Sequence, residues 1–210
     1  MFKNRLIKLS RKIFLSVLLT SFTNGYCGKS PSVENEKAGP LLELKNGYFF
    51  FTDSTMKKVY SNGGWDIQLS GSYPIRKFLQ IYGSVEYLQN QGKSLFDHQK
   101  TSIYEIPVNL GLKPIIALYP WMQVYVASGL RYCYIHQRNS SPYVDTVVRQ
   151  NGVGIFVNTG LNFIYNHFLI DLFGEYSSVN TKFHAHKTNV YGRNVQVGGL
   201  TFGLGLGYAF

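Results

Sequence analysis

Apolar side chains recur at every second position from Leu41 to Phe210, in one short segment after another, and no segment keeps a helical period. The final segment is the clearest case, because one of its faces carries large apolar residues: Leu200, Phe202, Leu204, Leu206, Tyr208 and Phe210. Its opposite face carries small residues, chiefly glycine. Successive side chains of a strand point to opposite faces, so this alternation predicts β-strands with one apolar and one small or polar face.

Eight segments show this alternation, and the connections between them alternate in length. We expect short connections at 74–77, 114–121 and 166–167, and longer polar ones at 54–64, 90–101, 135–150 and 178–195. Short turns at one end and long loops at the other are typical of transmembrane barrels. The pattern therefore predicts an all-β fold, an antiparallel up-and-down transmembrane β-barrel of about eight strands.

Periodicity alone does not say which face of the strands points outward, so a soluble barrel with an apolar interior is an alternative. A soluble exterior is rich in charged side chains, whereas charged residues make up 15% of this chain against roughly 25% in an average protein. The polar face is mainly Gly, Ser, Asn and Gln, and aromatic residues lie near the strand ends, as in membrane barrels. We therefore expect the apolar face to meet lipid, with Leu110, Leu204 and Leu206 among the lipid-facing residues.

The first 27 residues have the composition of a secretory signal peptide. Five bases precede an apolar run at residues 13–22, which is too short to span a membrane as a helix. Residues 28–40 are polar and contain two prolines, which predicts a flexible periplasmic lead-in. We expect a signal peptide at 1–27, this lead-in at 28–40 and the outer-membrane barrel domain at 41–210. Removal of the signal peptide lowers the formal net charge from +10 to +5.

The alternating last strand ends in Tyr208 and Phe210. Together with the signal peptide and the eight strands, this ending resembles the small bacterial outer-membrane barrels of the OmpA, OmpX and OmpW type, over about residues 41–210. The resemblance implies the outer membrane of a Gram-negative-type bacterium and lipopolysaccharide as a neighbour in the bilayer. It also implies that the outer-membrane assembly machinery recognises Tyr208 and Phe210. It constrains fold and location more than activity.

Charged residues of the inward face are expected to meet near the long-loop end. Pairing the strands about the centres of their turns sets Arg131 opposite Glu105. The same construction continues the row through Glu86 to Asp66. Three acids beside one arginine repel one another unless a proton or a further base compensates. We interpret the row as a structural ion-pair plug; a proton- or cation-sensing gate is the alternative, and catalysis is the least favoured reading.

The predicted long loops carry nine bases and two acids. The bases include Lys57, Lys58, Lys182, Lys187 and Arg193. An exported protein rarely meets nucleic acid, so lipopolysaccharide phosphate or a host or surface polyanion is the more natural anionic partner. Loops that are simply solvated are the alternative.

No catalytic or cofactor-binding motif stands out in the sequence. His184 and His186 form an H-x-H pair without the further ligands that a metal site normally needs. No His, Ser and acid share the spacing that a nucleophilic enzyme requires. We therefore expect a monomeric, non-enzymatic barrel, without metal or cofactor, that has a structural or surface-interaction role in the cell envelope. The alternative is a narrow porin-like channel, or a conduit for small, hydrophobic solutes.

Deletion of Phe210 should reduce the amount of barrel assembled in the outer membrane, because the final strand loses the aromatic residue at its end. The measurement is the amount of heat-modifiable protein in the outer-membrane fraction, relative to total synthesis. Normal levels of folded barrel after the deletion would contradict the role assigned to this residue.

Overall fold

The computed structural model describes residues 39–95, 97–140, 145–183 and 193–210 of the chain. These residues belong to one compact unit, Lys37–Phe210. The predicted signal peptide (1–27) and all but the last two residues of the predicted lead-in (28–40) lie outside the described residues.

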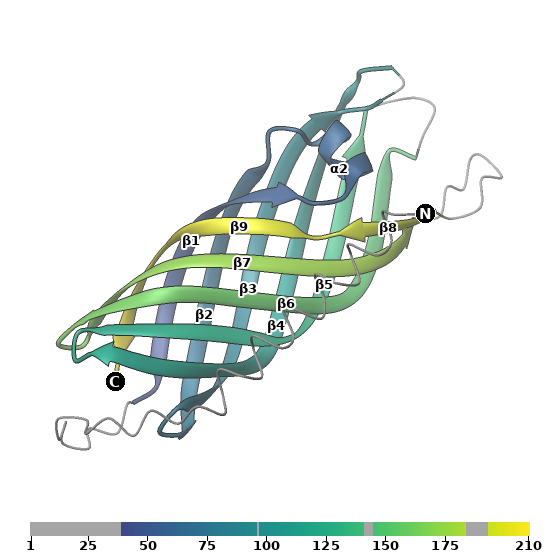
Figure 1. The fold of residues 1–210 in the computed structure, drawn as a ribbon. Helices are drawn as coiled ribbons and strands as arrows, with labels where there is room; N and C mark the ends of the chain where they lie inside the picture. Colours follow the sequence, from purple (N-terminus) through teal and green to yellow (C-terminus); the bar gives the residue numbers. More distant parts are fainter. Residues whose placement is uncertain (1–38, 96, 141–144, 184–192) are drawn as a thin grey trace, which may run out of the picture. The chain divides into compact units, whose positions relative to one another are not determined.

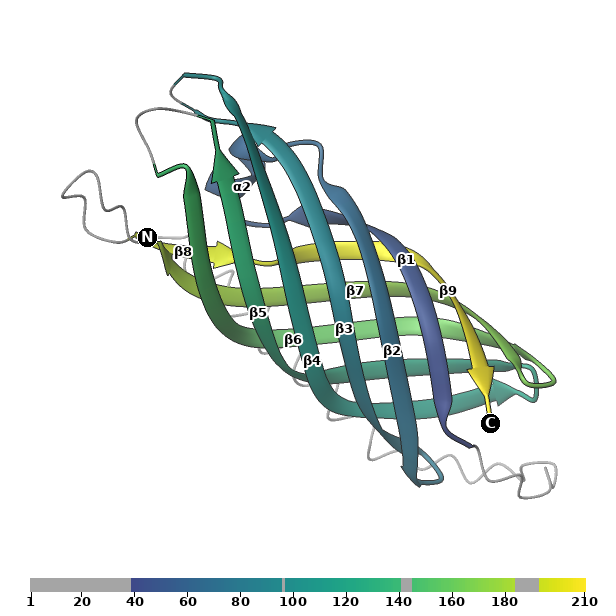
Figure 2. The same ribbon diagram turned by 180° about the vertical axis from the view of Figure 1, so that it is seen from behind.

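The unit is a closed antiparallel β-barrel (Figure 1). Its strands are β1 (Leu41–Phe51), β2 (Gly64–Arg76), β3 (Leu79–Lys93), β4 (Lys100–Tyr119), β5 (Met122–Asn139), β6 (Val147–Tyr165), β7 (Phe168–Phe183), β8 (Arg193–Val197) and β9 (Gly199–Ala209). Each strand pairs with the next around the wall, and β9 pairs with β1 to close it (Figures 1 and 2). Both β8 and β9 pair with β7 and are separated by Gly198, so they share one position in the wall. The predicted antiparallel barrel of about eight strands is confirmed.

One short helix, α2 (Ser54–Val59), lies in the connection between β1 and β2. The sequence predicted a longer polar connection here, which the structure has, but it did not predict the helix within it. Asp53 caps the helix, because its carboxylate accepts hydrogen bonds from the backbone N–H groups of Thr55 and Met56 at 2.8 and 3.1 Å. Among the described residues, no helix has the length and apolar character needed to cross a membrane.

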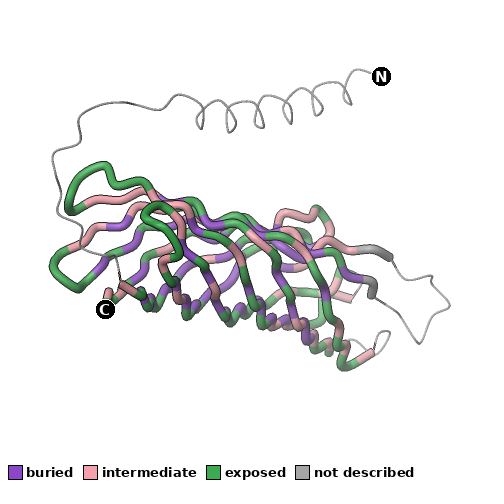
Figure 3. Tube along the Cα trace, turned by 90° about the horizontal axis from the view of Figure 1, so that it is seen from below, coloured by how far each residue is buried: buried purple, intermediate pink, exposed green. Residues whose placement is uncertain are grey.

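Buried and exposed residues alternate along the middle of the long strands (Figure 3). The exposed positions are mainly apolar, and most of the buried positions in the middle of the barrel are polar or charged. Leu110, Leu204 and Leu206 point outward and are 65%, 60% and 69% exposed. By contrast, Lys45 and Lys113 point inward and are fully buried. An exterior of exposed leucine, isoleucine and valine around an interior of charged groups fits a barrel whose surrounding solvent is lipid.

Aromatic rings gather at both ends of the apolar exterior. Near the long loops, Tyr48 packs edge-on against Trp65, with 5.8 Å between the ring centroids. Near the short turns, Tyr119 stacks on Trp121 at 5.6 Å. Two such aromatic girdles mark the membrane interfaces of transmembrane barrels.

The strands extend further than the sequence predicted, because two prolines do not end them. Pro74 lies within β2 and Pro114 within β4, so the turns shrink to residues 77–78 and 120–121. Both prolines lie at the margin of a ladder, where a missing N–H is tolerated. Pro74 flanks a register shift, and Pro114 pairs with Leu79, the first residue of β3.

Leu110→Arg should destabilise the barrel by about 2–4 kcal/mol, as a cation does at the middle of a lipid-facing strand. Gln91→Arg places the same side chain at an exposed outward position beyond the apolar belt and should cost at most about 1 kcal/mol, because the penalty falls toward the interface. Folding titrations in lipid vesicles measure both. Equal stability of the two variants would show that the belt does not lie in hydrocarbon.

Candidate functional site

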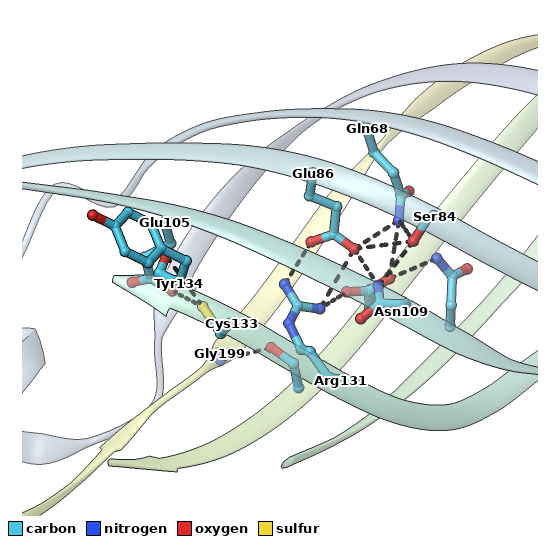
Figure 4. Close-up of polar contacts among 12 residues, drawn as sticks. Gln68, Ser84, Glu86, Glu105, Asn109, Arg131, Cys133, Tyr134 and Gly199 are labelled. Carbon is cyan, nitrogen blue, oxygen red and sulfur yellow. Dashed lines mark hydrogen bonds and ion pairs between the residues drawn. The ribbon is translucent and has the colours of Figure 1, made fainter. Parts of the chain in front are cut away.

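The most chemically distinctive part of the barrel is its interior, where buried charges form two groups. The first group, the Arg131 cluster, consists of Arg131, Glu86 and Glu175. Figure 4 shows Arg131 and Glu86. The guanidinium Nη2 lies 2.5 Å from Glu86 Oε2, and Nη1 contacts Glu175 Oε1. One cation from β5 therefore bridges carboxylates on β3 and β7, which lie on opposite sides of it around the wall.

Amide and hydroxyl groups surround the Arg131 cluster and satisfy its remaining oxygens. Gln68 Nε2 donates to Glu86 Oε1 at 2.8 Å and to Ser84 Oγ at 3.1 Å. Asn109 donates to Glu86 as well, and Asn158 Nδ2 donates to Glu175 Oε2 at 2.9 Å. The three amide donors come from three further strands, β2, β4 and β6 (Figure 4 shows Gln68 and Asn109 beside Glu86). Buried carboxylates are tolerable when charged groups and hydrogen-bond donors meet them in this way.

The second group, the Lys45 cluster, lies closer to the short turns and consists of Glu43, Lys45, Lys113 and Asp171. Lys45 Nζ lies 2.6 Å from Asp171 Oδ2 and 3.3 Å from Glu43 Oε2. Lys113 Nζ lies 3.5 Å from the other oxygen of Glu43. Two ammonium groups thus face two carboxylates, so the formal charges of this cluster balance.

Buried aromatic rings join the two clusters. The Tyr125 hydroxyl lies 2.7 Å from Asp171 Oδ2 and 3.0 Å from Asn158 Oδ1. It therefore links Asp171 of the Lys45 cluster to Asn158, which donates to Glu175 of the Arg131 cluster. Lys113 Nζ lies 4.2 Å from the centroid of the same ring, within the range of a cation–π interaction. Tyr82 and Phe156 pack against each other at 5.8 Å and complete the layer.

The long-loop end of the interior is apolar, which the sequence did not predict. We call this region the apolar cap; it consists of Phe49, Phe51, Met56, Tyr60, Leu88, Ile103, Cys133, Ile135, Val179 and Val197. Helix α2 contributes Met56, and Tyr60 follows the helix and lies 3.2 Å from the Thr101 hydroxyl. Burial raises the pKa of Tyr60 to about 12, so this phenol stays neutral at physiological pH. The consecutive aromatics of β1 are divided, with Phe49 and Phe51 inward and Tyr48 and Phe50 outward.

The predicted row of Asp66, Glu86, Glu105 and Arg131 is placed differently from its prediction. All four side chains are buried in the interior, but Arg131 lies opposite Asn109 rather than Glu105. Glu105 lies opposite Leu88 and Ile135, and Asp66 lies opposite Leu88 rather than Glu86. The predicted turn centres came too early along the chain. For the β2–β3 and β4–β5 turns, Pro74 and Pro114 were expected to end the strands. The β3–β4 connection contains no proline; there the predicted loop, 90–101, is longer than the observed one, because β3 extends to Lys93 and β4 begins at Lys100. Each register was therefore wrong by an even number of residues, which keeps the face and changes the partner.

Of the predicted row, the structure brings Glu86 and Arg131 into an ion pair and leaves the other two apart. Neither Asp66 nor Glu105 forms an ion pair within the described part of the chain. Each keeps one buried oxygen without a hydrogen-bond partner there. Glu105 Oε2 accepts from the Cys133 thiol at 3.5 Å, beside the apolar cap (Figure 4). Across the described ranges, no group of three His, Cys, Asp or Glu side chains is arranged to hold a metal ion.

Several interior charges were missed when the row was drawn: Glu43, Lys45, Lys113, Asp171 and Glu175. Their signal was present, because each shares the inward parity of its strand. Lys113, Asp171 and Glu175 lie at polar-face positions of their alternating segments. What was missing was the long-range register that brings β7 and β1 to the same interior layer, which local turn pairing does not supply.

The predicted basic loop residues are divided among different elements. Lys57 and Lys58 are exposed on α2. Lys182 and Arg193 lie on the paired ends of β7 and β8 rather than in a loop, because these strands extend further than predicted. Lys187, like His184 and His186, lies outside the described residues.

No protein-family model and no curated protein matches the sequence. Solved structures do match. Neisserial surface protein A aligns with a TM-score of 0.53 and 15% identity, over 82% of this chain and 98% of that one. Ail of Yersinia pestis, solved with the heparin analogue sucrose octasulfate, aligns with a TM-score of 0.54 and 16% identity, over 82% and 99%. Outer membrane protein W of E. coli aligns with a TM-score of 0.53 and 11% identity, over 84% and 100%.

The chain has the fold of the small eight-stranded outer-membrane barrels. The resemblance predicted from the sequence is confirmed at the level of the fold, and the predicted outer-membrane location agrees with it. Identities this low relate the folds and leave the role of this chain to its own residues.

Arg131→Met should lower the free energy of unfolding by about 3–5 kcal/mol, because it leaves two carboxylates buried without their cation. Adding Glu86→Gln and Glu175→Gln to this variant should restore most of the loss. Urea titrations in lipid vesicles measure the three proteins. Arg138→Met, on the exposed wall of the same strand, is the matched control and should cost at most about 1 kcal/mol. A triple variant as unstable as Arg131→Met would contradict charge imbalance as the cause.

Proposed function

We propose that the protein is an exported, monomeric outer-membrane barrel with a closed lumen that acts through its surface, as a structural or surface-interaction component of the cell envelope. The filled interior carries this proposal. The Lys45 cluster, the aromatic layer, the Arg131 cluster and the apolar cap follow one another from the short turns to the long loops. A solute would have to displace buried ion pairs and buried aromatic rings to pass.

The chemistry of the outer surface of the barrel indicates which partners it could bind. The apolar wall is matched to lipid, and lipopolysaccharide is the outer-leaflet lipid of the envelope that we propose. Exposed bases such as Lys57 and Lys58 attract anionic groups, including those of a host or surface polyanion. The complex of Ail with a heparin analogue supplies an example of polyanion binding within this fold. Insertion through the outer-membrane assembly machinery completes the proposal, and none of its steps requires catalysis or a cofactor.

A narrow channel is the second reading, and one observation favours it. Several buried polar atoms of the interior lack a hydrogen-bond partner in the described part of the chain, among them Asp66 Oδ1, Glu105 Oε1 and Asn162 Nδ2. Polar atoms of this kind are sites where water would be favourable. Water at these points would lower the barrier to ion movement only if the sites became continuous through the two clusters.

Conductance in planar bilayers separates the two readings. Wild-type protein should show rare, small openings, because the ion pairs hold the interior closed. Arg131→Ala should open more often, since it removes the cation that bridges Glu86 and Glu175. Arg138→Ala on the outer wall is the control and should behave as wild type. Steady wild-type conductance that Arg131→Ala leaves unchanged would contradict the closed lumen and favour the channel.

A further inference from the structure

Each of four adjacent strands carries an exposed cation on its outward face, near its long-loop end. Beyond the apolar belt, the outward faces of β3, β4, β5 and β6 carry Lys93, Lys100, Arg138 and Arg149, all exposed. We call these four residues the basic band. The four strands follow one another around the wall, so the band covers one continuous sector of the exterior (Figure 2). The sequence had placed these bases in loops, and this prediction was wrong because the strands extend past them.

We infer that the basic band binds the phosphate groups of an outer-leaflet lipid. This inference rests on the proposed function, in which the long-loop end of the barrel faces outward in the outer membrane. It deepens that proposal by naming both the site and the ligand chemistry.

The height of the band on the wall fits lipid headgroups. Lys100 lies four residues beyond the outward Tyr104, and Arg138 lies four beyond the outward Tyr134. A strand rises about 3.4 Å per residue, so the cations lie about 14 Å along the strand from tyrosines of the interfacial girdle. Phosphates of a lipid headgroup occupy this zone, directly outside the hydrocarbon.

The band concentrates four positive charges on one sector of the exterior. Lys93 and Lys100 are direct cross-strand partners, an arrangement that costs free energy when like charges face each other. Within the described ranges, no ion pair joins a carboxylate to any of the four cations. A bound anion would remove this repulsion.

Arg138 is held in place by a stack of neighbouring side chains. The His136 ring lies flat against Tyr104, with 4.4 Å between centroids and 14° between planes. His136 Nε2 accepts a hydrogen bond from Arg138 Nε at 3.4 Å, and His136 is only 4% exposed. The cross-strand partner of His136 is Arg149, so the stack also lies beside the second guanidinium. A guanidinium oriented in advance loses less entropy when it binds phosphate through its free Nη groups.

A soluble polyanion is a different occupant, and the position of the band argues against it. The four cations point sideways from the wall, on the same strand faces as the lipid-facing residues. A polyanion that arrives from solution meets the bases of the connections first, such as Lys57 and Lys58 on α2. The lipid phosphate is therefore the ligand to which the geometry points.

Native mass spectrometry of protein purified from membranes in detergent, titrated with diphosphorylated lipid A, tests the inference. Arg138→Gln/Arg149→Gln should weaken binding at least about tenfold, because two charge-assisted phosphate contacts are lost. Lys57→Gln/Lys58→Gln, which removes the same charge from α2, should stay within about twofold of wild type. Dephosphorylated lipid A should bind wild type as weakly as diphosphorylated lipid A binds the double arginine variant.

Any other outcome contradicts the binding of lipid phosphate by the basic band. Equal binding by wild type and the arginine variant, with both folded by heat-modifiable mobility, would remove the band as a site and leave the proposed function intact. Loss of binding in the lysine control would move the site to the loops. If millimolar inorganic phosphate displaced bound lipid A as strongly as further lipid A does, the band would be a site for free anions. If heparin alone displaced it, the band would be a polyanion site. If an external amine reagent failed to label Lys57 on intact cells, the long-loop end would not face the cell exterior. That result would overturn the proposed function as well.

Discussion

The whole structure depends on one constraint, that a polar group facing hydrocarbon must find its partner within the protein. The backbone meets it by closing the ladder between β1 and β9, which leaves the wall without an edge. The alternation of side chains then follows, because a strand in a closed wall has one face toward lipid and one toward a narrow interior. Within the hydrocarbon belt, charges can occupy only the inner face, where ion pairs and hydrogen bonds offset the cost of their burial.

The two ion-pair clusters therefore have a role besides their contribution to stability. Buried ion pairs add little net free energy compared with well-packed apolar groups, yet breaking one is costly. A slip of two residues between neighbouring strands would keep every side chain on its own face but would separate Arg131 from Glu86 and Glu175, and Lys45 from Asp171. We infer that the clusters select one register among those that alternation alone allows. The same clusters fill the lumen, and this is why the exterior is where we look for function.

The barrel and the facing of its strands could be predicted from the sequence, because both follow from a period of two and from the length of connections. The contacts of the interior could not. The pairing of Arg131 with Glu175 joins β5 to β7, and that of Lys45 with Asp171 joins β1 to β7, so both depend on accumulated register around the wall. Pro74 and Pro114 misplaced two short turns. The basic band was missed for a separate reason, because the long-loop ends of β3 to β6 were assigned to polar loops. Helix α2 was too short, at six residues, to show a period.

A closed interior requires the Arg131 guanidinium to be shielded from water by its protein partners, and hydrogen exchange of its N–H groups measures this shielding most directly. In protein labelled with ¹⁵N-arginine and reconstituted in lipid, the side-chain N–H groups of Arg131 should exchange with D₂O far more slowly than those of Arg138 and Arg149 on the exterior. Protection of Arg131 that persists while the two exterior arginines exchange at once would support a closed, ion-paired interior. Exchange of Arg131 as fast as that of Arg138 would show a lumen open to water, and would contradict the account.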